Sequence, residues 1–390
     1  MTNNLCTETG YISLNHVGEQ LCGDRVEIVD KENENILVLA DGLGSGVKAN
    51  ILSTLTSKII STMLAGGMPI EECIDTIAST LPVCKVRQVA YSTFTVIRIL
   101  ENRVAELIQF DNPAVIVLRN GTRYNYPVST REVGGKQIHE SRFEVMENDV
   151  LIAMSDGAPF AGVGKEFNYG WQRDNIIDFA EANYHPDNSA KYIAANIVDE
   201  CNRLYEGEPG DDTTVAVVRV RARQSVNLVI GPPSDPKNDI KMMNLFFAKE
   251  GEKIVCGGTT SNIASRYLGK PLIPTLDYFD PEVPPISKLQ GVDLVTEGVV
   301  TISTVLKLGE DFLAGKDTSA DWTSKKDGAS LIAQKLFEKA TDINFFVGRA
   351  INPAHQNPDL PITFGIKIQL IENLAKCLEK MGKRIKVSYF

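Results

Sequence analysis

The chain has 390 residues, of which 43% are hydrophobic, and a formal net charge of −10. A chain of this length and apolar content can bury two hydrophobic cores, so two domains are a better expectation than one. The acidic balance, with no basic patch that contains interleaved aromatic residues, disfavours a nucleic-acid partner.

The start of the chain does not combine positive charge with an apolar stretch, as a secretory signal does. No apolar run approaches the length that crosses a bilayer. We therefore expect a cytoplasmic protein without a membrane partner.

Two aspartates in the first half follow apolar runs of strand length. Asp41 comes directly after the run 36–40, and Asp156 comes shortly after the run 150–154. Both carboxylates are therefore predicted to lie at the ends of strands.

Three more aspartates complete the pattern. Asp211 and Asp212 precede the β-branched run 213–218, so they lie where a strand begins. Asp24 follows a glycine at position 23. Antiparallel neighbours place the start of one strand beside the end of another, which would gather these carboxylates. Clustered carboxylates repel one another unless cations lie among them, and Mg²⁺ or Mn²⁺ prefers such oxygen ligands.

A plainer interpretation remains open, because Asp-Gly is a common turn dipeptide. The segment 41–46, Asp-Gly-Leu-Gly-Ser-Gly, also resembles a phosphate-binding loop, since it lies between a strand and a helix. Its spacing is not the G-x-G-x-x-G of a dinucleotide-binding loop, and no Lys-Ser/Thr pair follows it as in a Walker loop. Both observations disfavour a nucleotide-binding loop. We expect its glycines to let the backbone approach a cation, with the carbonyl of Gly42 as an extra oxygen ligand.

The remaining pattern of the first half alternates helices and strands. Apolar spacing predicts helices, glycine and proline mark their ends, and a meander of three strands is the simple interpretation of residues 89–119. The predicted helices are 47–63, 69–81, 171–182 and 188–205, and a hairpin turn is predicted at 120–121. Two antiparallel sheets with helices packed outside them fit this order.

The pattern of apolar residues changes after the polar stretch 221–224. Strands are predicted at 226–230, 254–256, 292–295, 343–347 and 385–387, and helices at 239–249, 302–313, 330–340 and 366–381. This βαβ pattern predicts a smaller three-layer α/β domain. Its glycine-rich segment 256–262 is either an anion-binding helix start or a simple capped turn. The proline-rich segment 270–285 is expected to be extended.

The histidines and cysteines form no sequence pattern typical of a zinc site or of a cysteine-based phosphatase. The four histidines form no H-x-H or H-E-x-x-H pattern, which disfavours a zinc hydrolase. The seven cysteines form no C-x-x-C pair and none has an arginine at the spacing of a Cys-x5-Arg phosphatase loop. Dispersed cysteines in an odd number indicate reduced thiols.

Four motifs in this order resemble the SpoIIE/RsbU/RsbX branch of the PP2C-type metal-dependent protein phosphatases. They are Cys-Gly-Asp at 22–24, Ala-Asp-Gly-Leu-Gly-Ser-Gly-x-Lys-Ala at 40–49, Ser-Asp-Gly at 155–157 and Gly-Asp-Asp-Thr-Thr-Val at 210–215. The ordered set is specific, although each motif alone is not. The resemblance covers residues 1–222, and no family is recognised in residues 225–390.

The resemblance implies an α-β-β-α sandwich and a bacterial signalling enzyme. Two Mn²⁺ or Mg²⁺ ions would bridge a hydroxide that attacks phosphoserine or phosphothreonine. Carried over by position, the metal ligands are Asp24, Asp41, Asp156, Asp211 and the carbonyl of Gly42, with Asp41 and Asp156 as the catalytic pair.

Other parts of the site are less defined by the resemblance. Asp212 matches the second acidic position of the closing motif, and Arg25 and Lys48 are candidates for contacting the substrate phosphate. In that family the helix after the Asp-Gly motif shifts and alters metal occupancy. Here Gly44 and Gly46 join that helix to Asp41, which suggests regulation through it.

Three functions follow as expectations. The first is a serine/threonine phosphatase acting on a partner-switching regulator, such as a phosphorylated anti-sigma-factor antagonist. The second is a small-molecule phosphohydrolase that uses the same metals. The third is a non-catalytic sensing module whose second domain binds a regulatory ligand.

Overall fold

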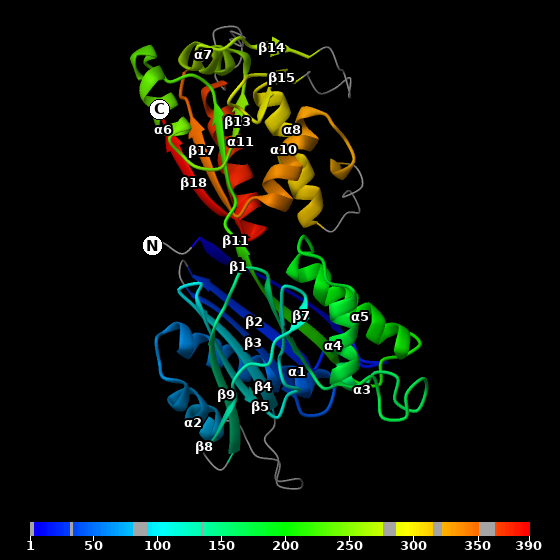
Figure 1. Ribbon diagram of the computed structural model, residues 1–390. Helices are drawn as coiled ribbons and strands as arrows, with labels where there is room; N and C mark the ends of the chain where they lie inside the picture. The colour runs from blue at the N-terminus through cyan, green and yellow to red at the C-terminus, as the bar shows by residue number, and fades with distance from the viewer. Residues whose placement is uncertain are drawn as a thin grey trace. The chain divides into compact units, whose positions relative to one another are not determined.

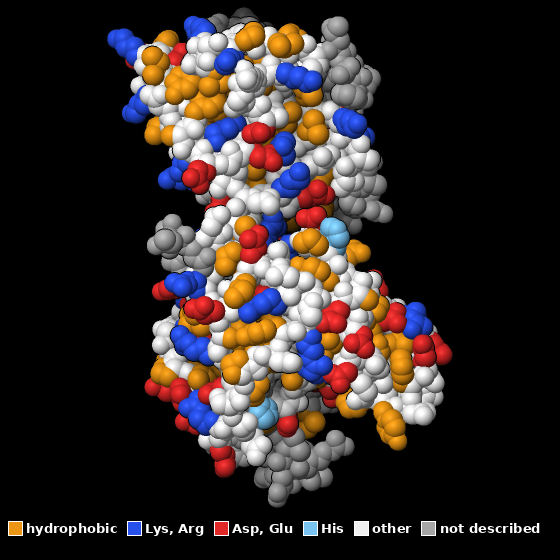
Figure 2. Space-filling view, in the orientation of Figure 1, with side chains coloured by type: hydrophobic (Ala, Val, Ile, Leu, Met, Phe, Trp, Pro, Cys, Tyr) orange, Lys and Arg blue, Asp and Glu red, His pale blue; other side chains and the backbone are white. Residues whose placement is uncertain are grey.

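Figure 1 shows the computed structural model, which describes residues 4–31, 34–80, 92–133, 136–275, 286–314, 322–350 and 363–390. The chain divides into two compact units, Met1–Ala222 and Arg223–Phe390. Across these ranges, no helix is both long and apolar enough to span a bilayer. Figure 2 shows acidic and basic side chains interspersed on the face in view.

The first unit contains two antiparallel sheets. Their strand orders are β1-β11-β10-β6-β7 and β2-β3-β4-β5-β9-β8. The strands of the first sheet are β1 (Leu5–Leu14), β11 (Thr213–Ala222), β10 (Asp149–Met154), β6 (Ile116–Arg119) and β7 (Thr122–Arg123). Those of the second are β2 (Asp24–Lys31), β3 (Glu34–Gly42), β4 (Ser92–Leu100), β5 (Val104–Phe110), β9 (Lys136–Glu144) and β8 (Ser129–Val133).

Strand β3 shows how one sequence supports two hydrophobic layers. Leu37 and Leu39 lie in the core between the two sheets. Ile36, Val38 and Ala40 lie in a second core on the other face of the same sheet. Successive side chains of a strand point to opposite faces, so an unbroken apolar run is what a strand covered on both faces requires.

Helices cover the outer face of each sheet. The helices are α1 (Gly46–Ala65), α2 (Ile70–Thr80), the short α3 (Gly157–Phe160), α4 (Arg173–Ala182) and α5 (Ala190–Leu204). α1 and α2 pack on the sheet of β3, and α4 and α5 pack on the sheet of β10. The layers therefore run α-β-β-α, which confirms the predicted sandwich.

The predicted three-strand meander is wrong. β4 and β5 are paired, but β6 leaves their sheet and pairs with β10 in the other one. The turn between β5 and β6 contains Asp111, whose φ is +57°, and it redirects the chain between the sheets. The predicted hairpin at 120–121 is confirmed by the pairing of β6 with β7. Residues 81–91, which include the start of the predicted strand region and the proline after α2, lie outside the described ranges.

The second unit is built on one seven-stranded sheet with the order β14-β15-β16-β13-β12-β17-β18. β16, β13, β12, β17 and β18 are parallel, and β14 and β15 add an antiparallel edge. The strands are β12 (Ser225–Ile230), β13 (Glu252–Cys256), β14 (Ile273–Pro274), β15 (Ser287–Lys288), β16 (Leu294–Thr296), β17 (Asp342–Val347) and β18 (Arg384–Tyr389).

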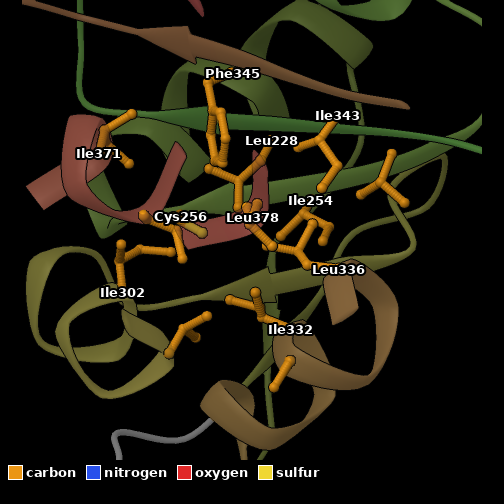
Figure 3. Packing of buried hydrophobic residues seen from close by; sticks show 14 of the residues in the cluster. Leu228, Ile254, Cys256, Ile302, Ile332, Leu336, Ile343, Phe345, Ile371 and Leu378 are labelled. Carbon is orange, nitrogen blue, oxygen red and sulfur yellow. The ribbon is translucent and has the colours of Figure 1, made fainter. Parts of the chain in front are cut away.

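Helices lie on both faces of this sheet. They are η1 (Pro236–Asn238), α6 (Asp239–Phe247), α7 (Gly258–Leu268), α8 (Val299–Leu313), α10 (Gly328–Ala333), η2 (Gln334–Lys339) and α11 (Thr363–Lys380). α6 and α7 pack on one face, and α8, α10, η2 and α11 pack on the other. Figure 3 shows this second core, where Cys256 of β13 and Phe345 of β17 meet Ile302 of α8 and Ile371 of α11.

The three-layer α/β fold predicted for this part of the chain is confirmed. One local difference is the predicted helix at 330–340, which is an α-helix as far as Ala333 and a π-helix from Gln334. The proline-rich segment 270–285 contains β14, and its residues 276–285 lie outside the described ranges.

Candidate metal centre in the first unit

Asp24 and Asp41 lie opposite each other on paired strands. Asp24 is the first residue of β2, and Asp41 is the penultimate residue of β3. The antiparallel register pairs the two residues directly. Directly opposed residues carry their side chains on the same face of a sheet. The structure therefore gives these two carboxylates a common position at the end of the hairpin.

Asp156 and Asp211 come from the other sheet. Met154, the last residue of β10, is paired with Val215 of β11. Asp156 therefore follows the end of one strand, and Asp211 precedes the start of its antiparallel neighbour. This is the arrangement that the sequence pattern predicted for the two residues.

Ser155 joins the two sheets at this point. Its hydroxyl donates a hydrogen bond of 2.7 Å to Asp24 Oδ2 and accepts one of 2.9 Å from the amide of Thr214. One buried side chain thus holds a carboxylate of the second sheet against the paired ends of β10 and β11.

Asp212 lies at the same junction. Its Oδ1 accepts a hydrogen bond of 3.0 Å from the amide of His16. Its Oδ2 lies 2.6 Å from the position where a Cβ would stand on Gly23. A side chain at position 23 would displace this carboxylate, which is a physical reason for glycine before Asp24.

Burial raises the pKa of Asp24, Asp41, Asp156 and Asp211, and repulsion by neighbouring carboxylates adds to it at Asp24, Asp41 and Asp211. The pKa of Asp24 rises to about 7, first through burial, with further repulsion from Asp212 and Asp156. The pKa of Asp41 rises to about 9, first through burial and then through repulsion by Asp24, Asp156, Asp211 and Asp212. Burial also raises the pKa of Asp156 and of Asp211. Asp24, Asp156, Asp211 and Asp212 are therefore all close enough to Asp41 to disfavour its ionisation.

Two buried oxygens of the cluster, Asp24 Oδ1 and Asp212 Oδ2, have no hydrogen-bond partner among the described residues. Buried polar atoms normally have one, so each indicates a missing ligand, ion or water. A divalent cation would satisfy these oxygens and reverse the rise in pKa. The donor set, which is all oxygen, fits Mg²⁺ or Mn²⁺.

In the described ranges, no three or more His, Cys, Asp or Glu side chains already form a group that could hold a metal ion. Mg²⁺ commonly takes one or two carboxylates and keeps several waters. The cluster therefore fits ions that are completed by water better than an ion enclosed by protein ligands alone.

Two glycines of the motifs are required by close packing. A Cβ on Gly42 would stand 2.1 Å from the carbonyl oxygen of Ala49 in α1. A Cβ on Gly157 would stand 2.3 Å from the carbonyl oxygen of Asp212. The glycine after Asp41 therefore lets α1 pack against β3. The glycine after Asp156 lets the backbone of the motif 210–215 pack against the start of α3.

The two basic candidates lie on the surface. Arg25 is adjacent to Asp24 on β2, so it points to the opposite face of the strand, where it forms an ion pair of 3.2 Å with Glu27. Lys48 is exposed in the first turn of α1. A contact with the substrate phosphate stays a prediction for both.

The contacts of Ser155 and Glu19 at this site are not indicated by the sequence pattern. Ser155 belongs to a recognised motif, but its partner Asp24 is 131 positions away, and spacing does not indicate such a pair. Glu19 accepts a hydrogen bond of 3.2 Å from Ser45 Oγ in the glycine loop, and no pattern in the sequence marks it.

Comparison with known proteins places the first unit in a family. Residues 31–221 match the family described as Stage II sporulation protein E (SpoIIE). The Stage II sporulation protein E of Bacillus subtilis (strain 168) is 27% identical over 189 residues, which cover 47% of this chain and 22% of that protein. The chain thus matches about a fifth of the length of this curated relative.

Two solved structures are each similar to just over half of the chain. One contains the PP2C phosphatase domain and a fragment of the regulatory domain of the cell fate determinant SpoIIE from Bacillus subtilis. It is 22% identical with a TM-score of 0.49, and the match covers 56% of this chain and 64% of that one. The other is RsbX in complex with magnesium, with 19% identity and a TM-score of 0.41, covering 55% and 95%. The matched segment, residues 31–221, belongs to the SpoIIE family, the family that its acidic motifs resemble.

Proposed function

We propose that the first unit hydrolyses phosphoserine and phosphothreonine monoesters in a signalling protein, using two divalent cations, Mn²⁺ or Mg²⁺. The observation that carries this proposal is the convergence of five carboxyls at one junction between two sheets, where the other four all raise the pKa of Asp41. A cluster with this charge is stable as anions when cations lie within it. Membership of the SpoIIE family supports the same activity.

The proposed ligands are Asp24, Asp41, Asp156, Asp211 and the carbonyl of Gly42, with Asp212 as a further carboxylate. Divalent cations held there would activate water for attack on phosphorus and neutralise charge on the phosphoryl oxygens. The protein's own contribution is to fix the carboxylates before the substrate arrives. Ser155 orients Asp24 by its 2.7 Å hydrogen bond.

A protein substrate is proposed from the family resemblance, with a phosphorylated anti-sigma-factor antagonist as the expected type of partner. A small-molecule phosphohydrolase is the alternative. The two are separated by comparing rates on phosphoserine peptides, an intact phosphorylated antagonist, nucleotides and sugar phosphates under the same metal concentration. Faster hydrolysis of the small molecules would favour the alternative.

The catalytic assignment is tested by Mn²⁺-dependent release of phosphate from p-nitrophenyl phosphate and phosphopeptides. We expect Asp41→Asn and Asp156→Asn to lower kcat/KM by about a hundredfold or more, because metal ions contribute several kcal/mol to such reactions. Both substitutions keep the side-chain shape and remove a charge.

Asp187→Asn is the matched control. The Asp187 side chain is 92% exposed and lies outside the cluster, so this variant should keep wild-type activity. Wild-type rates in Asp41→Asn and Asp156→Asn, or the absence of metal-dependent activity in the wild-type protein, would refute the proposed function.

A further inference from the structure

The second unit has a glycine-rich helix start at the carboxyl edge of its parallel sheet. β13 ends at Cys256, and Gly257 and Gly258 lead directly into α7. The parallel strands lie in the order β16-β13-β12-β17-β18, which corresponds to 3-2-1-4-5 in chain order. In open sheets of this kind, ligands bind outside the carboxyl ends of the strands, at the point where the strand order reverses. Here that point lies between β12 and β17, and β13 is the neighbour of β12.

The start of α7 is accessible and has no side-chain cap. Gly257, the N-cap residue, has a φ of +101° and no side chain that could accept a hydrogen bond from the first amides. Gly258 and Thr259 are exposed, and the space where a Cβ of Gly258 would stand has no atom within 4 Å. The first amides of an α-helix have no partner within the helix, and they carry the positive end of its dipole. This end of α7 therefore offers donors to an anion.

The side chain of Thr260 provides an independent observation. It is 1% exposed, and its Oγ1 has no hydrogen-bond partner among the described residues. The same oxygen lies 3.6 Å from the Cβ position of Gly257, so it is directed toward the start of the helix. The neighbouring Ser261 differs, because its hydroxyl donates to the carbonyl of Gly257 at 2.9 Å. A buried hydroxyl without a protein partner is available to a bound water, ion or ligand.

A second helix begins beside the first. Cys256 and Thr296 are paired at the ends of β13 and β16, and the Cβ position of Gly298 lies 3.4 Å from Gly257 Cα. Gly298 precedes α8 and, like Gly257, supplies no side-chain cap. Two uncapped helix starts thus meet at one edge of the sheet.

A lysine lies at the same edge. The Nζ of Lys367 in α11 lies 2.5 Å from the Cβ position of Gly231 and donates to the carbonyl of Ala350 at 3.2 Å. Gly231 directly follows Ile230, which is paired with Cys256, and neighbouring strands lie about 4.8 Å apart. Within the described ranges, no carboxylate forms an ion pair with Lys367.

We propose that this edge of the second unit binds the phosphate group of a small phosphorylated molecule. The amides of Gly258 and Thr259, the hydroxyl of Thr260 and the ammonium of Lys367 would contact the phosphate. Phosphate fits because it accepts many hydrogen bonds and carries the charge that a helix start and a lysine attract. The proposal does not depend on the activity proposed for the first unit.

The test is calorimetric titration of the metal-free full chain with orthophosphate, AMP, ADP and ATP. Without metal ions, the clustered carboxylates of the first unit repel phosphate. Saturable phosphate binding by the metal-free chain is therefore assigned to the second unit. We expect Thr260→Val and Lys367→Gln each to weaken binding by about tenfold or more, because each removes a hydrogen bond to a charged group. Gly258→Asp should abolish binding, since an acidic residue there suits the helix start but repels the phosphate.

Two further variants make the result decisive. Thr304→Val makes the same change one turn into α8, where the hydroxyl donates to Val300, and it should leave binding unchanged. Glu297→Gln removes an exposed carboxylate beside Gly298 and should tighten binding. No saturable binding of any of the four phosphates, or binding that Thr260→Val, Lys367→Gln and Gly258→Asp leave intact, would overturn the proposal.

Discussion

The buried carboxyl of Asp41 links the ionisation of the protein to its stability. Its pKa is raised to about 9 and that of Asp24 to about 7, from an ordinary value of 3.8. Between the ordinary and the raised pKa, the folded protein without metal holds more protons at these positions than the unfolded chain does. Stability due to these groups is therefore lost as pH rises through this window.

We expect the free energy of unfolding of the metal-free protein to fall between about pH 5 and pH 8. Asp41→Asn should flatten this dependence, because its side chain does not ionise. Mn²⁺ should reverse the trend for the wild type, since protons then compete with the metal. Urea denaturation at several pH values measures this. A wild-type curve that equals that of Asp41→Asn would contradict the account.

At the residue scale, the sequence indicated the aspartates but not how they are held. Apolar runs that stop at Asp41 and before Asp156 mark the ends of strands, and the structure places both residues there. The hydrogen bond between Ser155 and Asp24 and the contact between Asp212 and Gly23 depend on how two sheets pack. Packing across more than a hundred residues leaves no periodic signal in the chain.

At the scale of elements, helices and buried strands were predictable and exposed strands were not. The unbroken apolar run of β3 is a strong local pattern. Helix α1 forms where it was predicted, but Val47, Ile51 and Leu55, on the apolar face that indicated it, are exposed. The buried face of α1 instead carries many small and polar residues. β9 is a largely polar strand, Lys136–Glu144, and its pairing with β5 depends on a partner distant in sequence. The crossing of β6 to the other sheet was missed because a short apolar run fits either sheet equally well.

The start of α1 is physically tied to the aspartate cluster. Gly44 and Gly46 have φ values of +94° and +67°. A Cβ on Gly46 would stand 2.5 Å from the Glu19 carboxylate, whereas Gly44 has open space around it. Movement of α1 would therefore be transmitted through this loop to Asp41.

We predict that Gly46→Ala weakens Mn²⁺ binding and lowers turnover, because it strains the loop and displaces Glu19. Gly67→Ala, at the other end of α1, is the matched control, since its φ is +82° and its surroundings are open. Both changes should cost about 1 kcal/mol or more of stability, as alanine at positive φ does. Equal metal affinity and turnover in wild type and Gly46→Ala would argue against a coupled helix.

At the scale of the whole molecule, the chain combines two units with separate hydrophobic cores. The first carries the acidic junction, and the second carries the glycine-rich sheet edge for which we propose a phosphate ligand. The SpoIIE match ends at residue 221, so the second unit lies beyond it. A regulatory function for residues 225–390 stays a prediction.

The central claim is that the five-carboxyl junction holds divalent cations. Its most direct test is titration of the metal-free full chain with Mn²⁺, followed by electron paramagnetic resonance, which counts free and bound ions. We predict two bound Mn²⁺ per chain for the wild type and fewer for Asp41→Asn, with Asp187→Asn unchanged. A wild-type protein that binds no Mn²⁺, or an Asp41→Asn variant that binds as many ions with the same affinity, would contradict the account.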